Sequence, residues 1–374
     1  MNISRRKMIS LIGGGTVLAA SGAYLTTRTP TTALAPWKDA GTYPDKRRRA
    51  LSYALLAPNP HNRQPWIAEL TGHDGITLYR DASLNLAETD PFDRQLTVGM
   101  GCFIELLVQA AAQEGTAASV GLFPDGDAPT EPVAKITLNG SANPDPLFAQ
   151  VMNRHTNRYA YDVTKPVKQS ALDEILANVT PGLRAGGTVI EKTVAPLRDL
   201  TLSAMVLEVS TPHINQETID LMRIGKSEIE ANPDGISLGG PLLDTLGQFG
   251  ILTREAVADQ ESGTFSATLD MFAKTFAATP SFLWLVSPGN TRPDQIAAGR
   301  SWVRLHLAAT ALGMSMQPVS QSLQEYPEMS DHYAAIHGLL AQKGETVQML
   351  GRLGFGPKQA PAPRWPLETR MQHA

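Results

Sequence analysis

The sequence predicts a single α+β domain in which a mixed sheet is flanked by helices and two degenerate tandem halves lie in one chain. The 374 residues are 42% hydrophobic and 18% charged, as in a globular protein long enough to bury a large core. An apolar strand, a polar loop and an Ala-rich helix ending in glycine also occur twice in the same order. An offset of 198 residues aligns three residue pairs of these helices: Leu107 with Leu305, Ala111 with Ala309, and Gly115 with Gly313. The alternative is that Ala-rich helices simply look alike.

Composition excludes several classes of protein. Apolar residues are too plentiful and the formal net charge of -4 is too small for a disordered chain. Cys102 is the single cysteine, so no disulfide can form within the chain. The mild acidity argues against a dedicated nucleic-acid partner, which normally meets a basic stripe.

Residues 1–35 contain no acidic side chain and have the three parts of an export signal. Arg5, Arg6 and Lys7 form the basic start, residues 9–25 form a weakly apolar middle, and Ala33-Leu34-Ala35 forms a small-residue cleavage pattern. The segment 4–9 resembles the twin-arginine signal, which implies the twin-arginine translocase as a partner and a periplasmic location.

The alternative for this segment is an uncleaved membrane anchor, because Pro36 is a poor residue to follow a cleavage site. A run of seventeen residues with four glycines is short for a spanning helix, which favours the export signal. We therefore expect a signal peptide over 1–35 and one domain over 36–374. The halves are expected at about 45–145 and 146–374, with a lid-like insertion at about 202–276.

In the first half, a helix is predicted over 45–57, where Leu51, Ala54 and Leu55 share one face before Pro58 and Pro60 end it. A stiff proline-rich loop follows. Further elements are then expected in this order: strands over 66–70 and 76–80, a long helix over 94–114, and a strand over 133–138.

In the second half, the insertion is mostly helical in pattern and is interrupted by residues 232–235 and 239–241. The elements expected after it are a strand over 282–287, a long helix over 294–312, a strand-like run over 347–356, and an extended proline-rich arm over 357–366.

Common catalytic motifs are missing from the sequence. The eight histidines are scattered, and neither a cysteine cluster nor an H-E-x-x-H motif suggests a metal. There is no G-x-S-x-G elbow and no correctly spaced dinucleotide fingerprint. We name no catalytic side chain.

Arg154 and Arg158 are four residues apart, with Thr156 between them. A helical start here would place both guanidinium groups on one side, next to free helix N–H groups, and this arrangement suits a phosphate dianion. The alternative is a solvated charged turn, the commoner fate of such a pattern.

The loop Ala57-Pro58-Asn59-Pro60-His61-Asn62-Arg63-Gln64-Pro65-Trp66 resembles the P-S-S-x-N-x-Q-P-W loop of the nitroreductase superfamily, which lies along the isoalloxazine ring of FMN. Prolines lower the conformational entropy that the loop loses when it is ordered against a flat ring. Arg154-x-Thr156-x-Arg158 resembles the superfamily's phosphate motif, and Arg364 is similar to a residue of its basic C-terminal arm. Asn59-Pro60 departs from the Ser-Ser pair, and Pro60 has no N–H to offer the flavin.

The resemblance implies FMN as the cofactor. It implies these contacts to FMN: Pro58, Asn59, Asn62 and Gln64 along the ring, Arg154, Thr156, Arg158 and Arg364 at the phosphate, and Pro318 and Ser320 from the 315–320 turn. Relatives form such sites between two subunits, whereas here both parts lie in one chain. We therefore expect a monomer that mimics the dimer and binds one FMN.

More narrowly, the order of motifs along residues 45–370 resembles the Acg-like FMN-binding branch. The implied function is an exported oxidoreductase that transfers hydride or electron pairs through FMN to or from a small-molecule partner. The alternative is a protein that sequesters or stores FMN without turnover.

Overall fold

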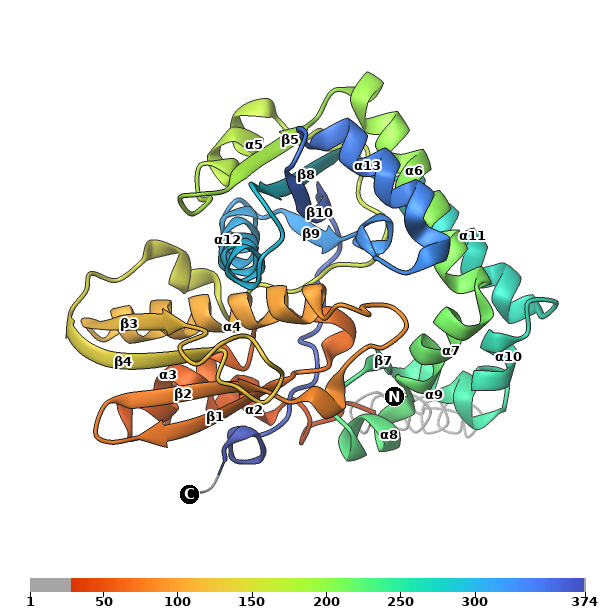
Figure 1. The fold of residues 1–374 in the computed structure, drawn as a ribbon. Helices are drawn as coiled ribbons and strands as arrows, with labels where there is room; N and C mark the ends of the chain where they lie inside the picture. Colours follow the sequence, from red (N-terminus) through yellow and green to blue (C-terminus); the bar gives the residue numbers. More distant parts are fainter. Residues whose placement is uncertain (1–27, 373–374) are drawn as a thin grey trace, which may run out of the picture.

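The computed structural model describes residues 28–372 and confirms the α+β class (Figure 1). The predicted signal segment therefore lies mostly outside the described residues. The strands form two four-stranded antiparallel sheets, ordered β1-β2-β4-β3 and β5-β8-β10-β9. The first sheet consists of β1 (Trp66–Thr71), β2 (Gly75–Arg80), β3 (Thr116–Leu122) and β4 (Ala134–Ser141). The second consists of β5 (Arg184–Thr188), β8 (Ser281–Ser287), β9 (Ser315–Pro318) and β10 (Thr346–Gly354).

Both sheets have the same order of elements along the chain. In each, two strands precede a long helix and two follow it, and the last strand pairs with the second. The helices are α4 (Arg94–Gln113) and α12 (Arg292–Ala311), which are 20 residues long and begin and end 198 residues apart. An isolated parallel bridge extends each sheet at an edge strand, at Ala68 with Met371 and at Met316 with Thr156.

The two long helices touch at a pair of glycines. A Cβ atom on Gly101 would lie 2.2 Å from the carbonyl oxygen of Ile296, and one on Gly299 would lie 1.9 Å from the carbonyl oxygen of Val98. Such distances are too short for any side chain, so only glycine permits this approach. The Cys102 thiol donates to the Gly299 carbonyl oxygen at 3.1 Å.

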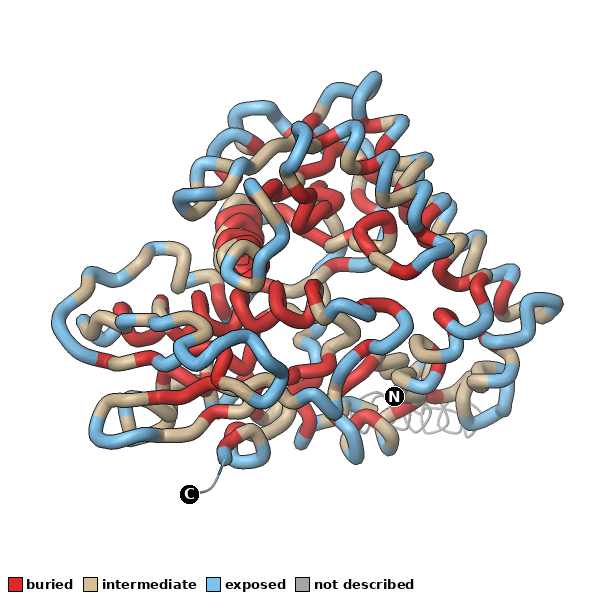
Figure 2. The backbone as a smooth tube through the Cα atoms, in the orientation of Figure 1, coloured by how far each residue is buried: buried red, intermediate tan, exposed pale blue. Residues whose placement is uncertain are grey.

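The main hydrophobic core runs through both sheets and both long helices, including Leu51, Phe103, Leu283 and Leu305. Figure 2 shows α4 and α12 as buried along most of their length. Among the described residues, α4 is the single helix long and apolar enough to span a bilayer, with a mean hydropathy of 1.4, but 89% of that stretch is buried inside the protein. It is therefore a core helix.

Helix α3 (Lys46–Ala54) packs against α4 and buries Leu51 and Ala54, as predicted from its apolar face, but it ends three residues before the expected position 57. Its N-cap is Asp45, whose carboxylate accepts from the backbone N–H groups of Arg47 and Arg48. The remaining elements outside the insertion are α2 (Ala35–Asp39), η1 (Pro60–Asn62), η2 (Ala82–Leu84), η3 (Pro146–Gln150), α5 (Gln169–Leu176), η4 (Gln321–Leu323), η5 (Pro327–Met329), α13 (Ser330–Leu340) and η6 (Leu367–Arg370).

The insertion separates β5 from β8 and forms the arc of green and teal helices in Figure 1. It contains α6 (Glu191–Ser210), α7 (Pro212–Asp220), β6 (Met222–Ile224), α8 (Gly225–Ala231), β7 (Ile236–Leu238), α9 (Pro241–Gln248), α10 (Arg254–Ala258) and α11 (Gly263–Ala277). Helical structure thus begins about ten residues before the expected boundary. The predicted break at 232–235 lies between α8 and β7, and the one at 239–241 ends on Pro241, the first residue of α9.

Candidate cofactor site

The proline-rich loop of residues 57–65 has an unusual backbone. His61, Asn62 and Gln64 have φ values of 47°, 52° and 53°, in the left-handed region that residues with side chains seldom adopt. Three such residues within four positions must be held by their surroundings, and strain of this kind is concentrated at functional sites. Pro58 is partly exposed at the start of the loop.

The loop is closed on itself and packed against α4. The Asn59 side-chain oxygen accepts from the Gln64 backbone N–H at 2.8 Å, and its amide donates to the Ala57 carbonyl at 3.2 Å. A Cβ atom on Gly99 would lie 3.0 Å from the Asn59 Cβ, so the small residue on α4 lets the loop approach. The Asn59 side chain therefore shapes the loop.

The side chains of Asn62 and Gln64 bind other parts of the chain. The Gln64 amide donates to the Pro233 carbonyl at 2.7 Å, and its oxygen accepts from the Trp365 backbone N–H at 2.9 Å. The Asn62 amide donates to the carbonyls of Pro233 and Pro363 at 3.3 and 3.1 Å. These two carboxamides therefore bind the insertion and the C-terminal arm to the loop.

Arg154 and Arg364 meet at the end of α3, and each is 3% exposed. All five N–H groups of Arg364 have acceptors within the chain. These are the carbonyl oxygens of Leu55, Leu56, Ala57 and Pro363, and the side-chain oxygen of Asn62. Arg154 donates to the Leu56 carbonyl at 2.9 Å, whereas its Nε has no hydrogen-bond partner.

Burial lowers the pKa of Arg154 to about 10 and that of Arg364 to about 9, and the charge of Arg154 contributes to the second shift. Among residues 28–372, no carboxylate forms an ion pair with either guanidinium. Two buried cations that share the Leu56 carbonyl oxygen and lack an acidic partner favour an anion.

Two histidines lie beside this pair. His306 Nδ1 is 3.5 Å from an Arg154 Nη atom, and its pKa is held well below the ordinary value by burial and by the Arg154 charge. The pKa of His155 falls to about 4 through burial and then through the charges of Arg154, Arg364 and Lys358. Both rings are therefore neutral near pH 7.

The segment of Arg154–Arg158 is extended, so the predicted helical start is wrong. Thr156 forms a parallel bridge with Met316, and the Asn157 backbone N–H donates to the Met316 carbonyl at 3.1 Å. Pairing with the edge of β9 satisfies backbone groups that a helix would otherwise have used. Free helix N–H groups are consequently absent from this segment within the described structure.

Arg158 is exposed and, within residues 28–372, makes no hydrogen bond or ion pair. The backbone on either side of Arg158 is held in place by Arg352, which is fully buried. The Arg352 guanidinium donates to the carbonyl oxygens of Asn157 and Tyr159. Arg352 could not be predicted from the sequence, since a lone arginine in a strand carries no signal.

Pro318 and Ser320 lie where β9 ends, close to the segment of Thr156. Pro318 pairs with Gly351 of β10, and Ser320 precedes η4 with a partly exposed side chain. Residues 315–320, which were expected as a turn, form β9 and the bend after it, and they lie beside the segment of Arg154–Arg158. The proline-rich loop lies next to Arg154 and Arg364.

His61, in the proline-rich loop, is influenced by the charge of Arg158 from the arginine segment. Its pKa is lowered to about 4, first by burial, while the charge of Glu217 opposes the shift and those of Arg158 and Arg63 add to it. Its Nδ1 atom is buried without a hydrogen-bond partner. His61 was not among the predicted site residues, although it lies within the predicted loop.

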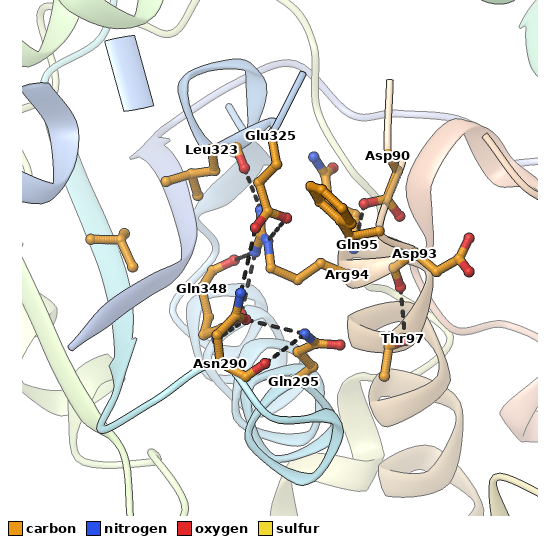
Figure 3. Close-up of polar contacts among 12 residues, drawn as sticks. Asp90, Asp93, Arg94, Gln95, Thr97, Asn290, Gln295, Leu323, Glu325 and Gln348 are labelled. Carbon is orange, nitrogen blue, oxygen red and sulfur yellow. Dashed lines mark hydrogen bonds and ion pairs between the residues drawn. The ribbon is translucent and has the colours of Figure 1, made fainter. Parts of the chain in front are cut away.

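Arg94 fixes the turn after β9 to the start of α4 (Figure 3). It is 1% exposed and donates to the Glu325 carboxylate at 3.0 Å, to the Gln348 carbonyl at 2.9 Å and to the Leu323 carbonyl. Farther along this turn, Gln324 donates to the buried Glu208 of α6, whose pKa burial raises to about 7.

Metal-ligand clusters of three or more His, Cys, Asp or Glu side chains do not occur among the described residues. The fold and the site together describe an α+β protein with a buried cationic centre beside a strained loop.

No family model matches the chain. A Mycobacterium tuberculosis protein provisionally named an NAD(P)H nitroreductase is 25% identical over 361 residues, covering 88% of this chain and 95% of its own length. An uncharacterized protein of the same organism is 24% identical over 353 residues, covering 87% and 92%. Both similarities extend over most of this chain and over most of the two proteins.

Among solved structures, the chain matches the FMN-dependent nitroreductase NfnB of Mycobacterium smegmatis in complex with NADPH. Its TM-score is 0.38 at 15% identity, over 61% of this chain and 98% of that one. A nitroreductase of Bacteroides fragilis with bound FMN has a TM-score of 0.34 at 13% identity, over 58% and 91%.

Proposed function

We propose that this protein is an FMN-dependent oxidoreductase of the nitroreductase superfamily, in its Acg-like branch. The observation that carries the proposal is the buried pair of Arg154 and Arg364, which has no acidic partner in the described chain and adjoins a loop with three left-handed residues. The similarity to the M. tuberculosis nitroreductase supports the same assignment.

The residues present fit an FMN phosphate. Burying a guanidinium without an anion is costly, and a phosphate would offset that cost with charge-assisted hydrogen bonds. Arg154 has an unused Nε, and Arg158 has its whole guanidinium available. Arg364 would contribute its charge and hold Asn62, because its N–H groups already donate to protein oxygens.

When bound, FMN would supply hydride or electron-pair transfer. The chain's own residues would bind and orient it: the arginines at the phosphate, the backbone of residues 58–64 along one side, and the 318–320 turn near the other. Since Asn62 and Gln64 are engaged with Pro233, their part is to hold the loop and the insertion in register.

The two halves act as the two subunits of a dimer, and one chain binds one FMN as a monomer. The shared strand order, the 198-residue offset of α4 and α12, and the meeting of a loop from the first half with arginines from the second support this proposal. The basic and apolar segments of residues 1–25 support export to the periplasm by the twin-arginine translocase.

A flavin absorbance spectrum of the purified protein tests the function. The native protein should be yellow, and Arg154→Ala with Arg158→Ala should lose FMN while keeping its far-UV circular dichroism. Lys168→Ala with Lys192→Ala removes the same charge from exposed positions and should retain FMN. A colourless native protein that does not respond to added FMN would refute the proposal.

FMN storage without turnover is the second candidate. It is favoured by the fastening of the insertion to the loop, through Asn62 and Gln64 and through the ion pair of Arg63 with Asp234. Anaerobic mixing of the flavin-loaded protein with NADPH, NADH and reduced quinones distinguishes the two. Reduction by at least one donor supports turnover, and reduction by none supports storage.

A further inference from the structure

The first described residues, 28–39, form a strap that is built into the folded protein. The backbone N–H groups of Thr32 and Ala33 donate to the two carboxylate oxygens of Glu230 on α8, at 3.2 and 3.0 Å. Ala33 is 2% exposed, and its carbonyl accepts from the Arg364 backbone N–H at 2.8 Å. The strap thereby joins the insertion to the C-terminal arm.

Trp37 connects the strap to the cationic centre. Its indole N–H donates to the Ala362 carbonyl at 2.8 Å, and its ring lies 5.1 Å from the ring of His155. The guanidinium carbon of Arg364 lies 5.9 Å from the Trp37 ring, within range of a cation–π interaction. Trp37 therefore excludes water from one side of this centre.

The expected cleavage site falls inside this strap. Ala35 is the first residue of α2, Pro36 is buried, and Ala33, the first alanine of the cleavage pattern, is bound on both sides. Proteolysis needs an exposed segment that can open locally. In the folded chain, cutting after Ala35 requires the strap to leave Glu230, Ala362 and Arg364 together.

We propose that residues 28–39 remain part of the functional protein, that the bond after Ala35 is not cut in the folded chain, and that the strap positions the C-terminal arm over Arg154 and His155. Removal of a leader, where it occurs, takes place at or before Arg28. This proposal does not depend on FMN, because the contacts that carry it lie within the protein.

Intact-mass analysis of the natural full-length product, taken from the soluble and membrane fractions of its host, tests retention. The folded protein should start at Arg28 or earlier. A folded protein that starts at Thr29 or later would overturn the proposal, whether or not it contains FMN.

Hydrogen exchange of the full chain tests the docking itself. The amides of Ala33 and Arg364 should exchange slowly, and Glu230→Gln should speed exchange in both the strap and the arm, since one carboxylate oxygen is lost. Glu261→Gln, at an exposed position of the insertion, is the matched control. Fast exchange of residues 30–37 in the native chain would contradict the proposal.

Trp37→Ala should also move the titration of His155, followed by NMR, towards the ordinary histidine range, because water replaces the indole. Trp37→Phe keeps the ring and should shift it less. An unchanged His155 titration in Trp37→Ala would show that the strap does not shield the centre.

Discussion

At the scale of single residues, the cationic centre is defined by what its members lack. Arg154, Arg364, His155 and His306 lie together, and within the described chain they have carbonyl oxygens and one another as neighbours, with no carboxylate bonded to them. Burial lowers the pKa of all four groups, and the charge of Arg154 adds to the shifts of Arg364, His155 and His306. The centre is thus less stable in acid, and an anion relieves it.

The histidines predict how stability depends on pH. The folded pKa of His155 is about 4 against an ordinary value near 6.5, so the unfolded chain binds the proton more readily. The free energy of unfolding should therefore fall as the pH drops from about 6.5 to about 4. His155→Gln should flatten this part of the curve in chemical denaturation of flavin-free protein, whereas His73→Gln in the exposed β1–β2 turn should not. Equal slopes in both variants would contradict the prediction.

Arg352 predicts a second effect, on the position of Arg158. Replacing Arg352 with Met frees the carbonyl oxygens of Asn157 and Tyr159, so FMN affinity should fall by about tenfold or more along with a loss of roughly 2–4 kcal/mol in stability. Arg352→Lys should not restore affinity, since an ammonium cannot reach both carbonyls from the geometry of a guanidinium. FMN titration and thermal unfolding measure the two effects. If Arg352→Lys binds FMN with native affinity, the position of Arg158 does not depend on the hydrogen bonds from the Arg352 guanidinium.

Sequence patterns could predict which residues lie at the candidate site. They could not predict which groups the side chains of those residues bind. The loop and Arg154 were predictable because prolines and paired arginines are visible locally. The partners of Asn62 and Gln64 were not, because Pro233 and Pro363 lie about 170 and 300 residues away. A side chain's bonding partners depend on that tertiary neighbourhood.

At the scale of elements, the long helices were predicted within two residues of their observed ends, since their apolar periodicity and terminal glycines are strong signals. Outside the insertion, the strands β3, β5 and β9 were missed. β5 and β9 have five residues or fewer, and pairing with β8 or β10 determines where each lies. Short segments depend more on partners than on their own propensity.

The contact between α4 and α12 makes a prediction about glycine. Gly299→Ala places a Cβ against the Val98 carbonyl and should destabilise the protein by about 1–3 kcal/mol or more. Gly338→Ala in α13 meets nothing within 4 Å and should stabilise by about 0.5–1 kcal/mol through helix propensity. Denaturant unfolding of both variants gives the comparison. A neutral Gly299→Ala would mean that the two helices can separate without cost.

At the scale of the whole molecule, two sheets of equal strand order share one core, and the candidate site takes its loop from the first half and its arginines from the second. The same division explains why no short stretch of sequence contains a complete site. The insertion then adds a third group of contacts, through Pro233, Asp234 and Glu230.

This organisation predicts the stoichiometry. Titration of flavin-free protein with FMN should saturate at one FMN per 40.2 kDa chain, and light scattering should give a monomer. The reason is that Arg154, Arg158 and Arg364 all come from one half, whereas Arg47 of the first half is already paired with Asp45. Two FMN per chain, or an obligate dimer, would contradict the division of roles.

The pairing of Ala33 with Arg364 has a consequence for the timing of assembly. The cationic centre needs two segments that are far apart in the sequence. Arg364 supplies a guanidinium, and Trp37 of the strap supplies the indole that shields it. During synthesis, the strap emerges long before Arg364. A ribosome-bound intermediate that has not yet exposed Arg364 can fold its first sheet but cannot complete this centre, so stable capture of a ligand there must wait until Arg364 has left the ribosome.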